Sequence, residues 1–140
     1  MNKKLLVGEV MIKLNDFPIV HENELLRETI EEINKFGLGI ACITDSNKRL
    51  IGVLTDGDIR RLILKVQKPI SAIFVDDAYF YATKKFAYVY EETPLDEALL
   101  KMEKLKIWDL PVINIKKELK GLLHLHPALK LVLGISSKKI

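Results

Sequence analysis

Apolar residues recur at helical spacing in two segments of this chain. In the first segment they stand at positions i, i+4, i+7 and i+10, which places them on one face of a helix. The same pattern returns 69 positions later. The two stripes are Leu26, Ile30, Ile33 and Phe36, and then Leu95, Leu99, Met102 and Leu105. The spacing predicts two amphipathic helices.

Short apolar runs surround each predicted helix. Residues 40–43 are apolar, and residues 49–54 are apolar after Arg49. The two runs are separated by Asp45-Ser46-Asn47-Lys48, whose short polar side chains favour a turn, so the pair is predicted to form a hairpin. Residues 110–113 match the first of these strands. Short strands are predicted before each helix, at 17–20 and 87–90, and further helices after each hairpin, at 58–66 and 127–133.

The chain therefore contains two copies of a strand–helix–strand–strand–helix unit, which is an α+β arrangement. Sliding the chain by 69 places without a gap also superimposes Leu50 on Leu119 and Gly52 on Gly121. Each unit is too small to bury a good core by itself, so the two are expected to form one compact domain. We expect repeat 1 at 7–66, a connector at 67–86 and repeat 2 at 87–134.

Composition argues against a nucleic-acid-binding, a membrane-spanning or a disulfide-bonded protein. The net charge of the 140 residues is +3, and the lysines are scattered among glutamates, so no nucleic-acid partner is expected. No apolar run approaches the roughly 18 residues that a membrane span requires. One cysteine, Cys42, excludes an internal disulfide framework and favours a cytoplasmic location. Its apolar neighbours indicate a small core residue.

No set of side chains has the composition of a catalytic centre. The cysteine, the three histidines and the scattered acids do not form a nucleophile–base–acid set, so the chain is not expected to be an enzyme or to require a cofactor. His124 and His126 stand at i and i+2, on one face of a strand. Two imidazoles are too few for a structural zinc site, so no metal is expected, and contact with a ligand or an interface is favoured.

The segment Leu50–Arg61 ends an apolar strand in Thr55-x-x-Asp58 and begins a basic helix. This spacing is typical of a capping box, in which the hydroxyl and the acid satisfy backbone N–H groups and contribute roughly 0.5–2 kcal/mol. A carboxylate at a helix start can also accept two O–H donors from a vicinal diol. Both roles are compatible.

The repeated unit resembles the CBS domain, and the pair resembles a Bateman module, a regulatory fold that senses adenosyl nucleotides. The resemblance covers about residues 7–134 and implies two repeats related by a pseudo-twofold axis. The segment Gly52–Arg61 is similar to two bacterial forms, the CBS pair of arabinose-5-phosphate isomerases and that of some sugar nucleotidyltransferases. Phe36–Gly39, Val7–Met11 and Gly121–His126 favour the isomerases, as does the end of the chain shortly after repeat 2.

The resemblance also implies a ligand site. Asp58 would accept ribose hydroxyls, Thr55 and the helix start would face ribose or phosphate, and Gly57 would allow close backbone approach. Arg61 and the histidines would suit an anionic ligand. The predicted ligand-binding residues are Thr55, Asp58, Gly57, Ile19, Val20, Ile40, Ala41, Arg61, His124 and His126.

Repeat 2 departs from this pattern. His124 stands where repeat 1 has Thr55, and Pro127 stands where it has Asp58. Proline suits a first helical turn but cannot accept a ribose hydroxyl, so ligand occupancy is expected to be asymmetric. Trp108 either stacks on a base or is a packed or half-exposed core aromatic. The connector, aromatic over 74–81, either packs onto the domain or contacts a partner.

Three functions are consistent with these observations. The chain is the ligand-sensing CBS pair of a sugar-phosphate isomerase, acting on a sugar isomerase (SIS) catalytic domain, or the pair of a sugar nucleotidyltransferase, or a free-standing dimerisation module. The possible effector is an adenosyl nucleotide or a CMP-sugar, no cofactor is required, and a homodimer is expected. No membrane partner is expected.

Overall fold

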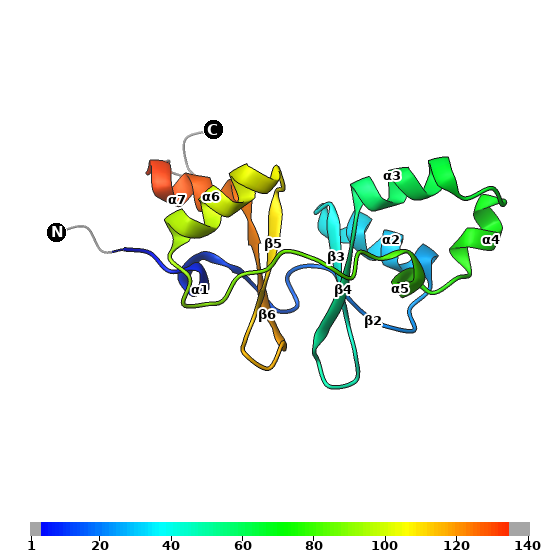
Figure 1. Ribbon diagram of the computed structural model, residues 1–140, viewed down its shortest axis with the longest axis horizontal. Helices are drawn as coiled ribbons and strands as arrows, with labels where there is room; N and C mark the ends of the chain where they lie inside the picture. Colours follow the sequence, from blue (N-terminus) through cyan, green and yellow to red (C-terminus); the bar gives the residue numbers. More distant parts are fainter. Residues whose placement is uncertain (1–3, 135–140) are drawn as a thin grey trace. The chain divides into compact units, whose positions relative to one another are not determined.

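The computed structural model describes residues 4–134, which form two compact units (Figure 1). Unit 1 contains the chain up to residue 14, residues 87–115, and the chain from residue 120 onward. Unit 2 contains residues 15–86 and 116–119. No helix within residues 4–134 is long and apolar enough to cross a membrane.

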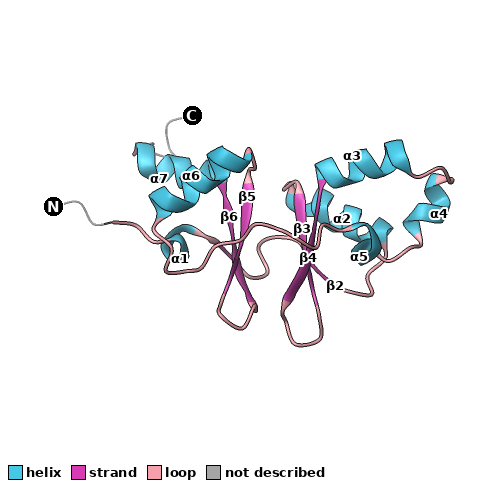
Figure 2. Ribbon diagram, in the orientation of Figure 1, coloured by secondary structure: helices cyan, strands magenta, loops and turns pink. Residues whose placement is uncertain are grey.

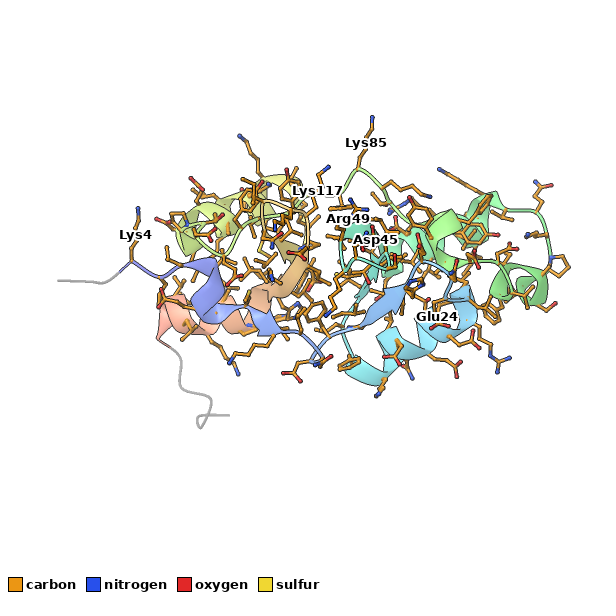
Figure 3. All side chains as sticks on the ribbon, turned by 90° about the horizontal axis from the view of Figure 1, so that it is seen from below. Lys4, Glu24, Asp45, Arg49, Lys85 and Lys117 are labelled. Carbon is orange, nitrogen blue, oxygen red and sulfur yellow. The ribbon has the colours of Figure 1, made fainter. Side chains whose placement is uncertain are left out.

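Unit 2 holds a three-stranded mixed sheet in the order β2-β3-β4. β2 (Ile19–His21) runs parallel to β3 (Ile40–Thr44), and β3 pairs antiparallel with β4 (Leu50–Thr55). Its helices are α2 (Leu26–Phe36), α3 (Asp56–Lys65), α4 (Ile70–Phe74) and α5 (Ala78–Tyr81). Two carboxylate oxygens of Asp45 hold the hairpin turn: Oδ1 accepts from the Arg49 backbone N–H and Oδ2 from the Arg49 side chain, at 3.0 and 2.9 Å (Figure 3).

Unit 1 holds the second three-stranded sheet, in the order β1-β6-β5. Figure 2 shows β5 and β6 of this sheet. Its strands are β1 (Ile12–Lys13), β5 (Asp109–Ile113) and β6 (Leu119–His124, within unit 1 from Lys120 onward). Its helices are α1 (Val7–Val10), α6 (Leu95–Leu105) and α7 (Leu125–Leu133), and α6 contacts α7. The two sheets with their covering helices confirm the α+β class.

The two predicted amphipathic helices are present, and their apolar stripes supply core residues. Leu26 and Ile33 are buried in unit 2, and Leu95 and Met102 in unit 1. Helices α3 and α7 begin at residues 56 and 125, two residues before the predicted starts, because each helix follows its strand without an intervening loop.

The predicted strand at 87–90 is wrong. Only Val89 pairs with β5, as an isolated parallel bridge to Val112. In unit 2 the N–H of Cys42 donates to the carbonyl of Pro18 at 2.9 Å and helps to hold β2 against β3. The residue 69 places after Cys42 is Pro111, which has no N–H to donate. The second repeat therefore lacks the hydrogen bond that would extend this strand.

The aromatic connector packs onto unit 2. Ala78 of α5 is fully buried, and Thr83 forms an antiparallel bridge with Val53 of β4. Phe80, on the same helix, is 73% exposed, so the connector is only partly buried. The connector therefore covers one edge of the unit 2 sheet and also presents one large aromatic side chain to solvent.

The N-terminal segment has the same place in unit 1 as the connector has in unit 2. The N–H of Leu95 donates to the carbonyl of Leu5 at 2.8 Å, and the N–H of Leu26 donates to the carbonyl of Asp76 at 2.8 Å. These carbonyls are 71 residues apart, whereas the helices are 69 apart, so an ungapped comparison of the repeats misses the correspondence. The structural units therefore differ from the sequence repeats: residues 4–14, assigned in part to repeat 1, pack with repeat 2.

A lysine occupies the left-handed position that ends α6, where α2 ends at glycine. Gly37 has φ 68° and Lys106 has φ 56°. A side chain in this region costs about 1–2 kcal/mol, which the extra flexibility of an unfolded glycine offsets in part. We expect Lys106→Gly to raise the free energy of unfolding by about 0.5–1 kcal/mol in urea denaturation, and the matched Gly37→Ala to lower it. A destabilised Lys106→Gly variant would contradict the stated cause.

Candidate functional site

The start of α3 in unit 2 carries the predicted capping box. The hydroxyl oxygen of Thr55 accepts a hydrogen bond from the Asp58 N–H at 3.1 Å, and Asp58 Oδ2 accepts from the Thr55 N–H at 2.9 Å. β4 ends at Thr55 and α3 begins at the next residue, so the strand delivers both groups to the helix start. The structural role predicted for this pair is confirmed.

Two further donors converge on the other carboxylate oxygen of Asp58. Arg61 Nη2 donates to Oδ1 at 2.9 Å from one turn along α3, and Thr83 Oγ1 donates to it at 3.0 Å from the connector. Burial raises the pKa of Asp58, but the hydrogen bonds from Thr55, Arg61 and Thr83 outweigh it and leave the pKa below its ordinary value. The site therefore holds an ionised carboxylate whose side chain is 11% exposed.

The lowered pKa of Asp58 makes the stability contribution of this residue depend on pH. An acid whose pKa is depressed in the folded state stabilises fully above its unfolded pKa of about 3.9 and loses that contribution as pH falls through the folded value. We expect Asp58→Asn to be less stable than wild type at pH 7 and pH 5, on the order of 1–2 kcal/mol. The difference should shrink at pH 3.5 and below. Urea denaturation at each pH measures it, and a difference independent of pH would contradict the assignment.

Two glycines lie close to charged side chains at the start of α3. The Asp56 N–H donates to the carbonyl of Gly39 at 3.0 Å, and a β-carbon on Gly39 would lie 2.8 Å from Asp56 Oδ2. A β-carbon on Gly57 would lie 3.2 Å from the Arg61 guanidinium. A side chain at either position would therefore press on the charged groups around the helix start.

The apolar residues predicted to line the site differ in exposure. Ile40 pairs with Thr55 across the hairpin and is buried, as are Val20 and Ala41, whereas Ile19 is half-buried. Val20 belongs to the core of unit 2 together with Leu26 and Leu54. These buried side chains offer a ligand little surface, so their contact with one stays a prediction.

Sequence reasoning did not find Thr83 or Asp109. Thr83 reaches Asp58 from 25 residues away, and Asp109 contacts His124 from 15 residues away. Neither position carries a local signal, because Thr83 lies in the connector and Asp109 stands where repeat 1 has the apolar Ile40.

The start of α7 in unit 1 is built differently. His124 Nδ1 lies 2.7 Å from Asp109 Oδ1, and no side chain caps the helix. The His126 ring lies 5.3 Å from the His124 ring and 5.4 Å from the Trp108 ring, measured between centroids. The Leu125 N–H donates to the carbonyl of Trp108 at 2.9 Å, as the Asp56 N–H donates to Gly39. The starts of α3 and α7 therefore share the same backbone hydrogen bond but carry different side chains.

Within residues 4–134 no group of three or more His, Cys, Asp or Glu side chains could hold a metal ion. Cys42 is fully buried in β3. The chemistry available at the start of α3 is therefore hydrogen bonding to an ionised carboxylate, with a nearby guanidinium, and at the start of α7 it is hydrogen bonding and stacking by aromatic rings.

Comparison with known proteins places this fold in a family. The CBS domain family matches residues 7–65 and 75–126, which together are most of the chain. The chain belongs to the CBS domain family. Pairs of CBS domains are regulatory, non-catalytic modules, and this is the class to which the fold and the sequence assign the protein.

The relatives include a sugar-phosphate isomerase. The arabinose 5-phosphate isomerase KdsD of Francisella tularensis is 32% identical over 139 residues, covering 95% of this chain and 40% of the relative. The chain spans about 38–40% of the length of the first curated relatives that it matches. The resemblance to isomerases of this type is thus confirmed for the CBS pair.

Two solved CBS pairs share the fold and were determined with adenosyl ligands. CBSX2 in complex with AMP is 24% identical, with a TM-score of 0.81, over 94% of this chain and 98% of that chain. The CBS domain pair of protein MJ0100, in complex with 5′-methylthioadenosine and S-adenosyl-L-methionine, is 22% identical, with a TM-score of 0.77, over 96% and 100%.

Proposed function

We propose that this chain is the ligand-sensing CBS pair of a sugar-phosphate isomerase of the arabinose 5-phosphate type. The observation that carries the proposal is the ionised Asp58 carboxylate at the start of α3, which accepts hydrogen bonds from Thr55, Arg61 and Thr83. The isomerase relative supports the setting, and the adenosyl ligands of the two solved pairs support the ligand class. The effector is a nucleotide or nucleotide-sugar, with an adenosyl nucleotide or a CMP-sugar as the candidates.

Arg61 gives the site a way to exchange partners. Its side chain is 52% exposed, so ribose hydroxyls can replace its hydrogen bond to Asp58 Oδ1 without disturbing the core. The carboxylate would then accept two O–H donors while Oδ2 keeps the cap on Thr55. The released guanidinium would be free to bind the phosphate of the same ligand, helped by the positive end of α3.

The ligand would act on a catalytic domain through a population shift. Binding must favour one conformational state of the module over another, since a ligand with equal affinity for both states transmits nothing. A coupling free energy of about 1–3 kcal/mol is enough for regulation. The partner on which the module acts is an SIS catalytic domain.

A thermal-shift screen tests the ligand proposal. The chain is heated with AMP, ATP, S-adenosylmethionine and CMP-sugars, each in separate samples. A ligand present at a hundred times its dissociation constant stabilises the folded state by about 2.7 kcal/mol, which gives a clear rise in Tm. If none of these compounds raises the Tm at millimolar concentration, the sensing role is contradicted and the dimerisation alternative is favoured.

We further propose that the module forms a homodimer. Apolar side chains are exposed on two helices: Ile63 and Leu64 on α3, and Leu131 and Val132 on α7. A second copy would cover them. We expect light scattering at micromolar concentration to give the mass of a dimer, and Leu64→Glu with Val132→Glu to give the mass of a monomer. A wild-type monomer would contradict the proposal.

The full reading frame distinguishes the isomerase from the nucleotidyltransferase. An SIS domain in the same frame supports the proposal, and a nucleotidyltransferase domain supports the alternative. The cytoplasmic location expected from the single cysteine stays a prediction.

A further inference from the structure

Thr83 of the connector is fixed in place by its backbone. Its N–H donates to the carbonyl of Val53 at 2.8 Å, and its carbonyl accepts from the Val53 N–H at 3.0 Å, so the connector pairs with β4 at this residue. A β-branched side chain such as that of threonine also has restricted rotation about its first bond. The sheet therefore sets the position of the hydroxyl that donates to Asp58 Oδ1 at 3.0 Å.

The two side chains that donate to Asp58 Oδ1 are held differently. Arg61 is a long side chain that is 52% exposed, and it is the donor that ribose hydroxyls are proposed to replace. Thr83 is tied to β4 by two backbone hydrogen bonds, which keep its hydroxyl within reach of the carboxylate. Rotation about the last bond of an aspartate side chain is broad, so a carboxylate needs fixed partners to keep one orientation. Once Arg61 has moved, the hydroxyl of Thr83 is the donor that holds Oδ1.

Unit 1 shows that the fold does not need a hydroxyl at this position. Thr83 pairs with Val53, and in unit 1 Ile12 pairs in the same antiparallel way with Leu122, which is 69 places after Val53. Unit 1 also has Pro127 where unit 2 has its acid. The acid and the hydroxyl are therefore present together in one unit and absent together in the other, although the backbone pairing is the same.

We propose that Thr83 is a positioning residue for the ligand, which acts through Asp58 and holds the carboxylate in the orientation that accepts ribose hydroxyls. The inference rests on the proposed nucleotide sensing and deepens it. It makes the connector part of the site, because ligand affinity then depends on how the connector is seated on β4. By linkage, a bound ligand would in turn stabilise that seating.

The experiment compares Thr83→Val, which keeps the shape and removes the hydroxyl, with Thr83→Ser, which keeps the hydroxyl and removes a methyl group. AMP and CMP are titrated into the whole chain by calorimetry, each beside its 2′-deoxy form. We expect Thr83→Val to bind the ribonucleotide about tenfold more weakly than wild type, and Thr83→Ser to stay within about twofold. The preference for the ribonucleotide over its deoxy form should also shrink in Thr83→Val, because the acceptor of the hydroxyls has lost its fixed orientation.

A purely structural role for Thr83 predicts the opposite order, since valine is closer than serine to threonine in shape and in preference for strands. Ile12→Val is the matched control in unit 1 and should leave the affinity unchanged. The inference alone is wrong if Thr83→Val binds as tightly as wild type, if Thr83→Ser loses as much as Thr83→Val, or if Thr83→Val does not fold. If neither nucleotide binds the wild-type chain at millimolar concentration, the proposed function is wrong as well.

Discussion

Asp58→Ala should reduce the affinity of this module for its nucleotide effector by about 30-fold to 1,000-fold, or roughly 2–4 kcal/mol. The variant removes the carboxylate that we propose as the acceptor for two ribose hydroxyls, and also the group that positions Arg61. Isothermal titration calorimetry with the strongest ligand from the thermal-shift screen measures the loss. Circular dichroism shows whether the variant remains folded after its cap is lost.

The matched control for Asp58→Ala lies at the corresponding position of the second repeat. Pro127 occupies the first turn of α7 and offers no acceptor for a hydroxyl. Pro127→Ala should therefore leave the affinity within about threefold of wild type. Equal losses in the two variants, or undiminished binding in Asp58→Ala, would show that the ligand does not bind at the start of α3.

Gly121→Ala should lower the free energy of unfolding by about 1–3 kcal/mol. A β-carbon at this position in β6 would lie 2.8 Å from the backbone carbonyl of Ile12 and 2.5 Å from the sulfur of Met11. A methionine side chain can move, but the carbonyl belongs to β1, whose pairing with β6 sets its position. The substitution therefore forces β1 away from β6 within unit 1.

Gly52→Ala provides the comparison, because Gly52 is the equivalent residue of the first repeat. There the nearest atom to an added β-carbon is the Ala82 side chain at 3.3 Å, and the nearest carbonyl, that of Thr83, is 3.5 Å away. We expect a loss below about 1 kcal/mol in urea denaturation. A Gly52→Ala variant less stable than Gly121→Ala would contradict the packing described for β1.

The amphipathic helices and the hairpins could be predicted because their signals are local. The spacing of Leu26, Ile30 and Ile33 predicts the buried face of α2. The turn residues that begin at Asp45 predict where the chain turns from β3 into β4. The short helices α1 and α5 have no such signal, since four residues are too few to show a period. The absent strand before α6 depends on one missing donor, Pro111, which a hydrophobic pattern does not reveal.

The residues of the candidate site also differ in whether the sequence reveals them. Thr55 and Asp58 lie three residues apart and form a recognisable cap, so the sequence identifies them. Thr83 and Asp109 act through hydrogen bonds from distant parts of the chain, and only the fold brings them to Asp58 and His124. The burial of Ala41 is also a property of the sheet and not of the motif.

We propose that ligand binding at the start of α3 regulates an isomerase. The most direct measurement replaces the CBS pair of the Francisella tularensis arabinose 5-phosphate isomerase, about 40% of its length, with this chain. The isomerisation rate is then followed against the concentration of a ligand that binds the isolated module. We predict a change of about 5-fold or more at saturation, and no change when the chimera carries Asp58→Ala. A rate that is unaffected by a ligand shown to bind the chimera would contradict the regulatory role.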